Sequence, residues 1–356
     1  ATAAQIMQHI KGLAAFIIAS FLNKAYIDVA LSALIPGLLY LVGVCIAVTV
    51  YARRYELPKL VEKVDTERIK RLLPTFIISF GVVLWFLLGY RSPAIAGLWG
   101  IALAILFSML QGKYRPTRKQ MYDAIQEGFY LVAILSLLLV AVGPLGQVML
   151  TTNLSGRLGS ALVQYLPDTQ LILLIGAMIV SLILGMGLPT PVAYIIVALA
   201  LVPFMQQIGI PALQAHFFVF YFAVFSTLTP PVAVSVLAAA KLGEASFLST
   251  AKDAIKIALT TFIIPFAFVF SPELMTFPDV TVKTFIAIAE VIFVQVAVSV
   301  ASYGFLFRSL NGVERGGYTI VALSGFLGFT YDTNFWYVAV TIFFAMSGYV
   351  YITKKA

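Results

Sequence analysis

Long apolar stretches follow one another along almost the whole chain, and this pattern limits the possible folds more than any other feature. A helix crosses a bilayer with about 20 predominantly apolar residues. Hydrophobic residues form 61% of the sequence and charged residues only 11%, whereas ordinary globular domains are about half apolar and a quarter charged. The alternating pattern of a membrane β-barrel is absent. The sequence therefore predicts an all-α, polytopic membrane protein embedded in a lipid bilayer.

The apolar stretches lie at residues 13–22, 26–51, 73–91, 93–111, 121–150, 170–187, 190–208, 213–228, 231–241, 247–271, 280–307, 317–330 and 335–352. The pieces at 13–22, 213–228 and 231–241 are too short to cross a bilayer as helices. Short apolar pieces of this kind are typical of half-membrane or re-entrant elements.

Basic residues gather between the apolar stretches and indicate the orientation of the chain. Lys and Arg concentrate in the cytoplasmic loops of membrane proteins, so the basic loops 52–72 and 112–120 are expected in the cytoplasm. The loop 271–279 carries two acidic residues and no basic residue, which favours the outer side. The net charge of +8 therefore reflects orientation, and we predict no nucleic-acid partner.

The sequence lacks the residues that common catalytic sites need. Two histidines and the single Cys45 cannot form an ordinary zinc site. No HExxH, G-x-S-x-G or phosphate-binding P-loop motif is present. The sequence therefore predicts a protein that is not an enzyme.

A cluster of helix breakers interrupts the apolar stretch 182–203, LILGMGLPTPVAYIIVALALVP. Unpaired backbone groups cost several kcal/mol in hydrocarbon, so irregular backbone survives there only where it lines a cavity or water. We predict an unwound segment at 185–191, whose free carbonyls hold a cation and whose following helix N-terminus holds an anion. A proline kink that only shapes packing is the alternative. The candidate binding residues here are Gly185, Gly187, Pro189, Thr190 and Tyr194.

A second break occurs in VFSTLTPPVAVSVLAAA, between two short apolar arms. This pattern predicts a re-entrant helical hairpin whose tip exposes hydroxyls and free backbone at mid-membrane depth. A surface loop between two short helices is the alternative. The candidate binding residues are Ser226, Thr227, Thr229, Pro230 and Pro231. Together the two breaks suggest a cation held by backbone oxygens at Gly187 and Thr229, which would be sodium if the family resemblance described below holds.

His216, before the second break, has two possible roles. An ionisable group inside a membrane is a functional candidate by default, which favours proton transfer. A histidine that caps a helix at the membrane interface is the expectation we prefer.

The stretches 26–51 and 247–271 resemble each other, since each follows a short apolar helix and a polar turn and each contains one proline, Pro36 or Pro265. The charge pattern orients them in opposite directions across the membrane. We therefore predict inverted repeats, which are common in secondary transporters; a chance similarity is the alternative.

Three sequences, LGMGLPTPVAYIIVALALVP, GIPALQAHFFVFYFAVFSTLTPPVAVSVLAAA and IIPFAFVFSPELM, resemble the large membrane subunit of tripartite ATP-independent periplasmic (TRAP) transporters. They are most similar to the fused membrane subunit of the TAXI type. The similarity is strong over 170–275 and weaker over 13–55.

The resemblance implies an elevator-type secondary transporter in the cytoplasmic (inner) membrane of a bacterium or archaeon. A periplasmic substrate-binding protein would deliver a small organic anion, such as a carboxylate. A sodium or proton gradient would drive its uptake, with no other cofactor. By the same resemblance, 185–194 would be the second unwound segment and 226–231 the tip of the second hairpin.

The resemblance also suggests how the chain is divided. It implies the second half of a transport domain together with scaffold helices. The expected parts are a remnant of the first hairpin with the following helix (1–51), a basic cytoplasmic linker (52–72), scaffold helices (73–150), the second transport repeat with its hairpin (151–275) and C-terminal scaffold helices (276–356).

Two departures from the family pattern leave an alternative open. The family's GLPTT is GLPTP here, so Pro191 replaces a threonine and its hydroxyl. At the first hairpin the family reads approximately GGQIMPPVMGAAAF, whereas residues 3–16 here read AAQIMQHIKGLAAF. Most of the family's first repeat has no counterpart in the residues before this motif. We expect either part of a longer permease or a degenerate relative that acts as a non-transporting scaffold subunit.

Overall fold

The computed structural model describes residues 13–58, 65–89, 92–167 and 169–353. Within these residues the secondary structure is helical except for turns and one isolated bridge between Phe305 and Ser309. Six helical stretches are long and apolar enough to cross a membrane, namely Tyr26–Arg54, Thr66–Leu88, Thr190–Gln207, Phe247–Phe270, Val282–Tyr303 and Asn334–Ile352. The predicted all-α, polytopic membrane class is confirmed.

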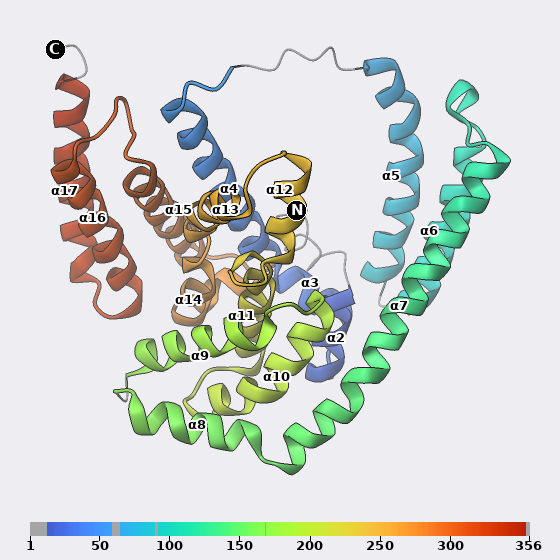
Figure 1. Cartoon of the computed structure of the whole chain (residues 1–356), viewed down its shortest axis with the longest axis horizontal. Helices are drawn as coiled ribbons and strands as arrows, with labels where there is room; N and C mark the ends of the chain where they lie inside the picture. The colour runs from blue at the N-terminus through green and yellow to red at the C-terminus, as the bar shows by residue number, and fades with distance from the viewer. Residues whose placement is uncertain (1–12, 59–64, 90–91, 168, 354–356) are drawn as a thin grey trace. The chain divides into compact units, whose positions relative to one another are not determined.

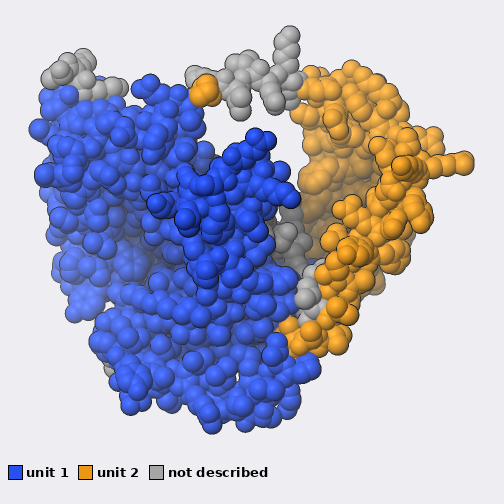
Figure 2. Space-filling view, viewed as in Figure 1, with its two compact units in different colours: residues 1–22, 30–57, 144–356 blue, residues 23–29, 58–143 orange. Residues whose placement is uncertain are grey.

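The chain divides into two compact units, coloured separately in Figure 2. Unit 1 consists of Ala1–Leu22, Ala30–Leu57 and Pro144–Ala356, and unit 2 of Asn23–Val29 and Pro58–Gly143. This division rests on contacts alone. The five functional segments expected from the sequence stay a prediction.

Unit 2 is built around a helical hairpin. α5 (Thr66–Leu88) packs against α6 (Pro93–Ser108), followed by the short η1 (Gly112–Tyr114) and the first part of α7 (Arg118–Thr151). Asp65 caps α5 by accepting a hydrogen bond from the Arg68 amide at 3.0 Å. Lys113 pairs with Glu67 at 3.0 Å, which fixes η1 to the first turn of α5.

Unit 1 contains the remaining helices (Figure 1). They are α2 (Leu13–Leu22), α4 (Leu34–Arg54), α8 (Leu154–Tyr165), α9 (Gln170–Gly185), α10 (Thr190–Gln207), α11 (Ala212–Phe225), η2 (Ser226–Leu228), α12 (Val234–Leu242), α13 (Phe247–Leu259), α14 (Ile263–Phe270), η3 (Pro272–Met275), α15 (Val282–Tyr303), α16 (Gly312–Thr330) and α17 (Asn334–Ile352). α3 (Tyr26–Ser32) and α7 each contribute to both units.

The core of unit 1 is α11. Every residue from Gln214 to Phe225 is buried, as expected for a helix that is apolar on all sides. Its aromatic rings pack edge-on or tilted against those of α14; for example, Phe218 lies 5.3 Å and Phe222 5.9 Å from Phe266, centroid to centroid. This packing places the end of α11, and the break that follows it, in the interior of unit 1.

The two stretches that resemble each other are each divided into two helices. α3 and α4 meet at Ala33, and α13 and α14 are separated by residues 260–262. In both cases the second helix has proline as its third residue, Pro36 or Pro265. Proline has no amide to donate and is tolerated in the first turn, so each proline starts a new helix. That the two stretches are inverted repeats stays a prediction.

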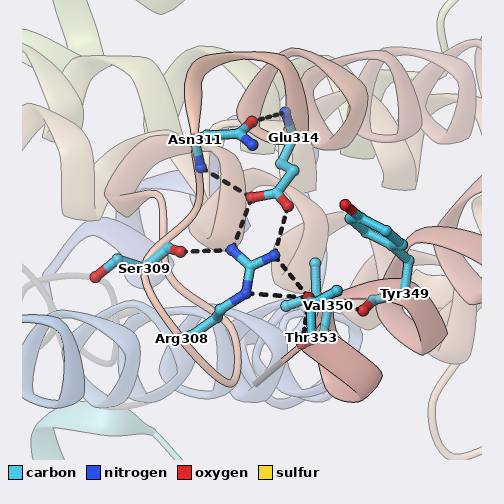
Figure 3. A network of polar contacts seen from close by, with 7 residues as sticks. All are labelled: Arg308, Ser309, Asn311, Glu314, Tyr349, Val350 and Thr353. Atoms are coloured by element: carbon cyan, nitrogen blue, oxygen red, sulfur yellow. Dashed lines mark hydrogen bonds and ion pairs between the residues drawn. The ribbon is translucent and has the colours of Figure 1, made fainter. Parts of the chain in front are cut away.

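A polar network holds the start of α16 (Figure 3). Arg308, in the loop after α15, donates to both carboxylate oxygens of Glu314, at 2.6 and 3.0 Å. The Glu314 carboxylate also accepts from the Asn311 amide at 2.8 Å, and the Asn311 side chain accepts from the Glu314 amide at 2.9 Å. The Glu314 side chain is only 7% exposed, so these contacts compensate a nearly buried charge.

The network extends to the ends of two other helices. Arg308 donates to the Thr353 hydroxyl at 2.8 Å, beyond α17, and to the Ser309 carbonyl at 2.8 Å. Arg54, the last residue of α4, donates to the Ser309 hydroxyl at 2.7 Å. Bidentate hydrogen bonding between arginine and a carboxylate is among the stronger polar contacts in proteins. The network therefore joins α4, α16 and α17 at one end of unit 1.

We predict that Glu314→Ala lowers the free energy of unfolding by about 2–3 kcal/mol, because it removes a helix cap and leaves the Arg308 charge without its partner. Asn311→Ala, which removes only the cap, should cost about 1 kcal/mol. Unfolding of the purified protein in detergent, followed by tryptophan fluorescence, measures both. Equal effects of the two substitutions would contradict a role for the ion pair.

Candidate functional site

The first helix break is confirmed, but it is shorter than the sequence suggested. α9 ends at Gly185 and α10 begins at Thr190, so only Met186–Pro189 are outside helices, whereas an unwound segment over 185–191 was expected. Pro191 lies in the first turn of α10, where its missing amide costs no hydrogen bond. Gly187 has φ +76°, a left-handed conformation that suits glycine.

The second break runs from η2 to the start of α12. Ser226–Leu228 form a single turn of 3-10 helix, Thr229 is extended, and α12 begins at Val234. The Pro230–Pro231 peptide bond is cis. Ala233 is fully buried and has φ +38°, a conformation that costs a non-glycine residue about 1–3 kcal/mol and tends to occur at functional sites.

The hairpin lies one element earlier than the sequence analysis placed it. α9 and α10 pack against each other and are joined by residues 186–189 alone, so they form a helical hairpin. α12 instead packs mainly against η2 and α13, and not along α11 (Figure 1). The left-handed Gly187 reverses the chain within one tight turn. The longer connection 226–233 carries the chain onward, so 226–231 is a break between successive helices and not a hairpin tip.

The two breaks touch each other. A Cβ atom added to Gly185 would lie 2.6 Å from the Ser226 hydroxyl oxygen and 3.4 Å from the Ala223 Cα. A Cβ atom added to Gly187 would lie 3.3 Å from a methyl group of Val232. Glycine at 185 therefore allows the end of α9 to lie directly on η2, and the two predicted groups of residues form one site.

Three hydroxyl groups of the second break donate to backbone carbonyls, and in the described part of the chain only that of Thr227 also accepts a hydrogen bond from another side chain. Ser226 donates to the Ala223 carbonyl at 2.7 Å, Thr227 to the Val224 carbonyl at 2.8 Å, Thr229 to the Ser226 carbonyl at 3.1 Å and Ser235 to the Thr227 hydroxyl at 3.1 Å. A hydroxyl has one donor and two acceptor lone pairs. Oriented in this way, these oxygens can accept from an ammonium or amide, or ligate a cation.

Four helix ends meet at the breaks. α9 and η2 end here, and α10 and α12 begin here, with Gly187 beside Val232. Neither α10 nor α12 has a side-chain cap within the described residues. The first amides of a helix have no partner inside it, although the Val236 amide donates to the Ala233 carbonyl at 2.9 Å and Pro191 has no amide. Helix N-termini attract anions and C-terminal carbonyls attract cations. The arrangement therefore offers both kinds of ligand in one place.

Burial divides the site into an inner and an outer part. Ser226 and Thr227 are buried, and Thr190 and Thr229 are half-buried. The exposed members are Gly187, Pro189, Pro230 and Pro231. The site is therefore open on the proline-rich side and closed on the side of α11.

Tyr194 does not share this site. Its hydroxyl lies 2.7 Å from His216 Nδ1, and both residues are buried. The ring of Phe21 stacks on His216 at 5.5 Å between centroids. Tyr194 lies one helical turn beyond Thr190 and faces α11, whose side chains enclose it. The expectation that Tyr194 adds a ligand beside Gly187 is not met, and His216 is a buried partner of Tyr194 and not an interfacial cap.

Three residues beside the breaks were missed by the sequence analysis, namely Val232, Ala233 and Ser235. Ser235 could have been noticed, because it is the single polar residue in the arm 231–240. The left-handed conformation of Ala233 has no signal in the sequence, since alanine is usually helical. Residues 3–11, on which the altered family motif falls, lie outside the described residues.

We predict that Gly185→Ala lowers the free energy of unfolding by about 1–3 kcal/mol, because its Cβ forces η2 away from α9. Gly348→Ala is the matched control: it has open space around it in α17 and should stabilise by about 0.5–1 kcal/mol. Thermal unfolding in detergent measures both. Adding Ser226→Gly should recover part of the loss. Equal stability of the two single variants would exclude a tight contact between the breaks.

The comparisons with known proteins are consistent with this geometry. A search of the curated proteins finds no match. The family model described as "Tripartite ATP-independent periplasmic transporter, DctM component" matches residues 1–307, which is most of the chain. The family is one of transporters and not of enzymes. The chain therefore belongs to the DctM family, the membrane component of tripartite ATP-independent periplasmic transporters.

Proposed function

We propose that this chain takes up small organic carboxylates by ion-coupled transport, with the touching breaks at 186–189 and 226–233 as the binding site. The observation that carries the proposal is the meeting of two helix C-termini and two helix N-termini at these breaks. Interrupted helices of this kind bind substrate and coupling ion near the membrane midplane in secondary transporters. A periplasmic substrate-binding protein would deliver the substrate.

The main chain is the source of electrostatic recognition in this proposal. Residues 170–240 contain no Asp, Glu, Lys or Arg, and the imidazole of His216 is engaged with Tyr194. A carboxylate would therefore accept hydrogen bonds from the uncapped first turns of α10 and α12. Thr190, the first residue of α10, would add a hydroxyl donor.

The coupling ion would occupy the opposite, carbonyl-rich side of the breaks. Sodium prefers oxygen ligands, and the backbone oxygens of Gly187 and Thr229 are candidates. The Ser226 hydroxyl donates to a carbonyl of α11, so its oxygen can ligate a cation, and the Thr227 oxygen, which also accepts from Ser235, keeps one further lone pair. A cation bound here would also offset the charge of the carboxylate, which couples the two binding events. A proton is the alternative coupling ion.

The transporter type, the transport mechanism and the cellular location are proposed from sequence motifs. LGMGLPTPVAYIIVALALVP and IIPFAFVFSPELM support the TAXI type, an elevator-type mechanism and a place in the cytoplasmic (inner) membrane of a bacterium or archaeon. The second candidate function is a non-transporting scaffold subunit. Pro191 favours it, because it replaces a threonine hydroxyl at the start of α10.

The double substitution Ser226→Ala and Thr229→Ala tests the site. Uptake driven by a sodium gradient should fall roughly tenfold or more, because a hydrogen bond to a charged group contributes about 1.5–3 kcal/mol. The assay is uptake of radiolabelled carboxylates by cells that carry the complete transporter and its receptor. Membrane insertion, measured by immunoblot, should not change.

The control removes two hydroxyls that also bond within their own helix. Thr151 donates to the Gln147 carbonyl at 3.0 Å and Thr152 to the Val148 carbonyl at 2.7 Å. Thr151→Ala with Thr152→Ala should transport normally. Normal uptake by the Ser226 and Thr229 variant would remove these residues from the mechanism. No uptake by the unsubstituted protein with any carboxylate would favour the scaffold function.

A further inference from the structure

An apolar groove of about 410 Å³ lies on unit 1, and none of its lining residues belongs to the helix breaks. It is formed by α13 and α14 on one side, α15 at the base and α16 on the other side. Leu259, Phe266, Val298, Leu323 and Phe326 are among its lining residues. Leu259 is 40% and Leu323 57% exposed, so the groove is accessible from outside at these residues.

The groove follows the helix axes. On α16 it is lined by Thr319, Leu323 and Phe326, which recur at the spacing of one helix face. This face covers about 10 Å along the helix at 1.5 Å per residue. A shape of this kind, narrow and parallel to membrane helices, fits an extended hydrocarbon chain.

One end of the groove is polar and the other is aromatic. Ser302 on α15 and Thr319 on α16 lie at the polar end, and Phe266 and Phe326 at the aromatic end. The polar end belongs to the last turn of α15 and the second turn of α16, next to the loop 304–311. The groove is thus apolar, with its two hydroxyl side chains at one end.

Arg315 lies at the polar end. Its Nε donates to the Ala301 carbonyl at 3.1 Å and its Nη2 to the Ser302 carbonyl at 3.2 Å, and both of these residues line the groove. Among the described residues Arg315 has no carboxylate partner, and it is exposed. A guanidinium has five N–H donors, so several of them remain directed to solvent.

A second cation lies on α13, one of the helices that line the groove. Lys256, half-buried, precedes the lining residue Leu259 by one helical turn of α13, and residues three apart share a helix face. The other charged residues of α13 are Lys252 and Asp253. α13 thus carries two lysines and one aspartate, and Glu314 beside Arg315 is already paired with Arg308, so basic residues are in excess on α13 and at the start of α16.

We propose that this groove binds an anionic phospholipid, with one acyl chain along α15 and α16 and the phosphate at Arg315 and Lys256. The surrounding bilayer supplies the ligand. Basic pockets between membrane helices on the cytoplasmic side recognise anionic headgroups, and the excess of Lys and Arg in the neighbouring loops places this end in the cytoplasm. The proposal does not depend on the transport mechanism.

The test compares two lipids that differ only in the headgroup. The full chain is purified, exchanged into detergent and mixed with phosphatidylglycerol or phosphatidylcholine of identical acyl chains. Native mass spectrometry then counts the lipids that stay bound. We expect one phosphatidylglycerol to be retained in preference to phosphatidylcholine. Retention without headgroup preference would overturn the proposal, since the lipid would then be ordinary bilayer lipid.

Substitutions locate the site. Arg315→Gln with Lys256→Gln should reduce retained phosphatidylglycerol by roughly fivefold for each basic side chain removed. Arg315→Lys should retain most of the binding. Arg53→Gln with Lys241→Gln removes two exposed charges elsewhere and should have no effect. If both double variants lost the same amount of bound phosphatidylglycerol, the effect would be one of overall charge. That result would contradict a specific binding site at Arg315 and Lys256.

A second pair of variants tests the acyl-chain groove. Val298→Trp fills it and should abolish retention of the lipid. Val313→Trp is the matched control, because Val313 is 86% exposed and does not line the groove. Unfolding temperatures in detergent show whether either variant is misfolded. Unchanged retention by a folded Val298→Trp protein would exclude the groove as the binding site.

Discussion

The decisive constraint on this protein is that backbone amides and carbonyls cannot be left unpaired in hydrocarbon. Two segments of unit 1, Met186–Pro189 and the connection after Phe225, nevertheless leave the helix. They are accommodated because they lie against each other, with Gly185 in contact with Ser226. Each break thereby packs against the other on one side, and helix ends of opposite polarity converge there.

The rest of unit 1 supports this contact. The buried aromatic rings of α11 fix its position against α14, and the α9–α10 hairpin packs on α11. Since residues 170–240 carry no Asp, Glu, Lys or Arg, helix dipoles and hydroxyl groups dominate the electrostatics at the breaks. The charged residues lie elsewhere, as in the Arg308–Glu314 network that ties α4, α16 and α17.

The sequence predicted the helical class and the positions of both breaks, because prolines and glycines in apolar stretches have strong local effects. It did not predict which break forms the hairpin. That depends on the left-handed Gly187, which turns the chain back, and on how α12 packs. It also placed Tyr194 at the site, although the side chain faces His216. The direction of a side chain on a buried helix depends on neighbours far away in the sequence, such as Phe21.

Hydrogen–deuterium exchange at the two breaks tests most directly whether their main-chain groups bind ligand together. Exchange of the amides in 186–192 and 229–235 would be measured in the complete transporter, with and without sodium and a transported carboxylate. Binding at the touching breaks predicts that adding both ligands slows exchange in the two segments together. Unchanged exchange in both segments, under conditions where uptake is active, would contradict it.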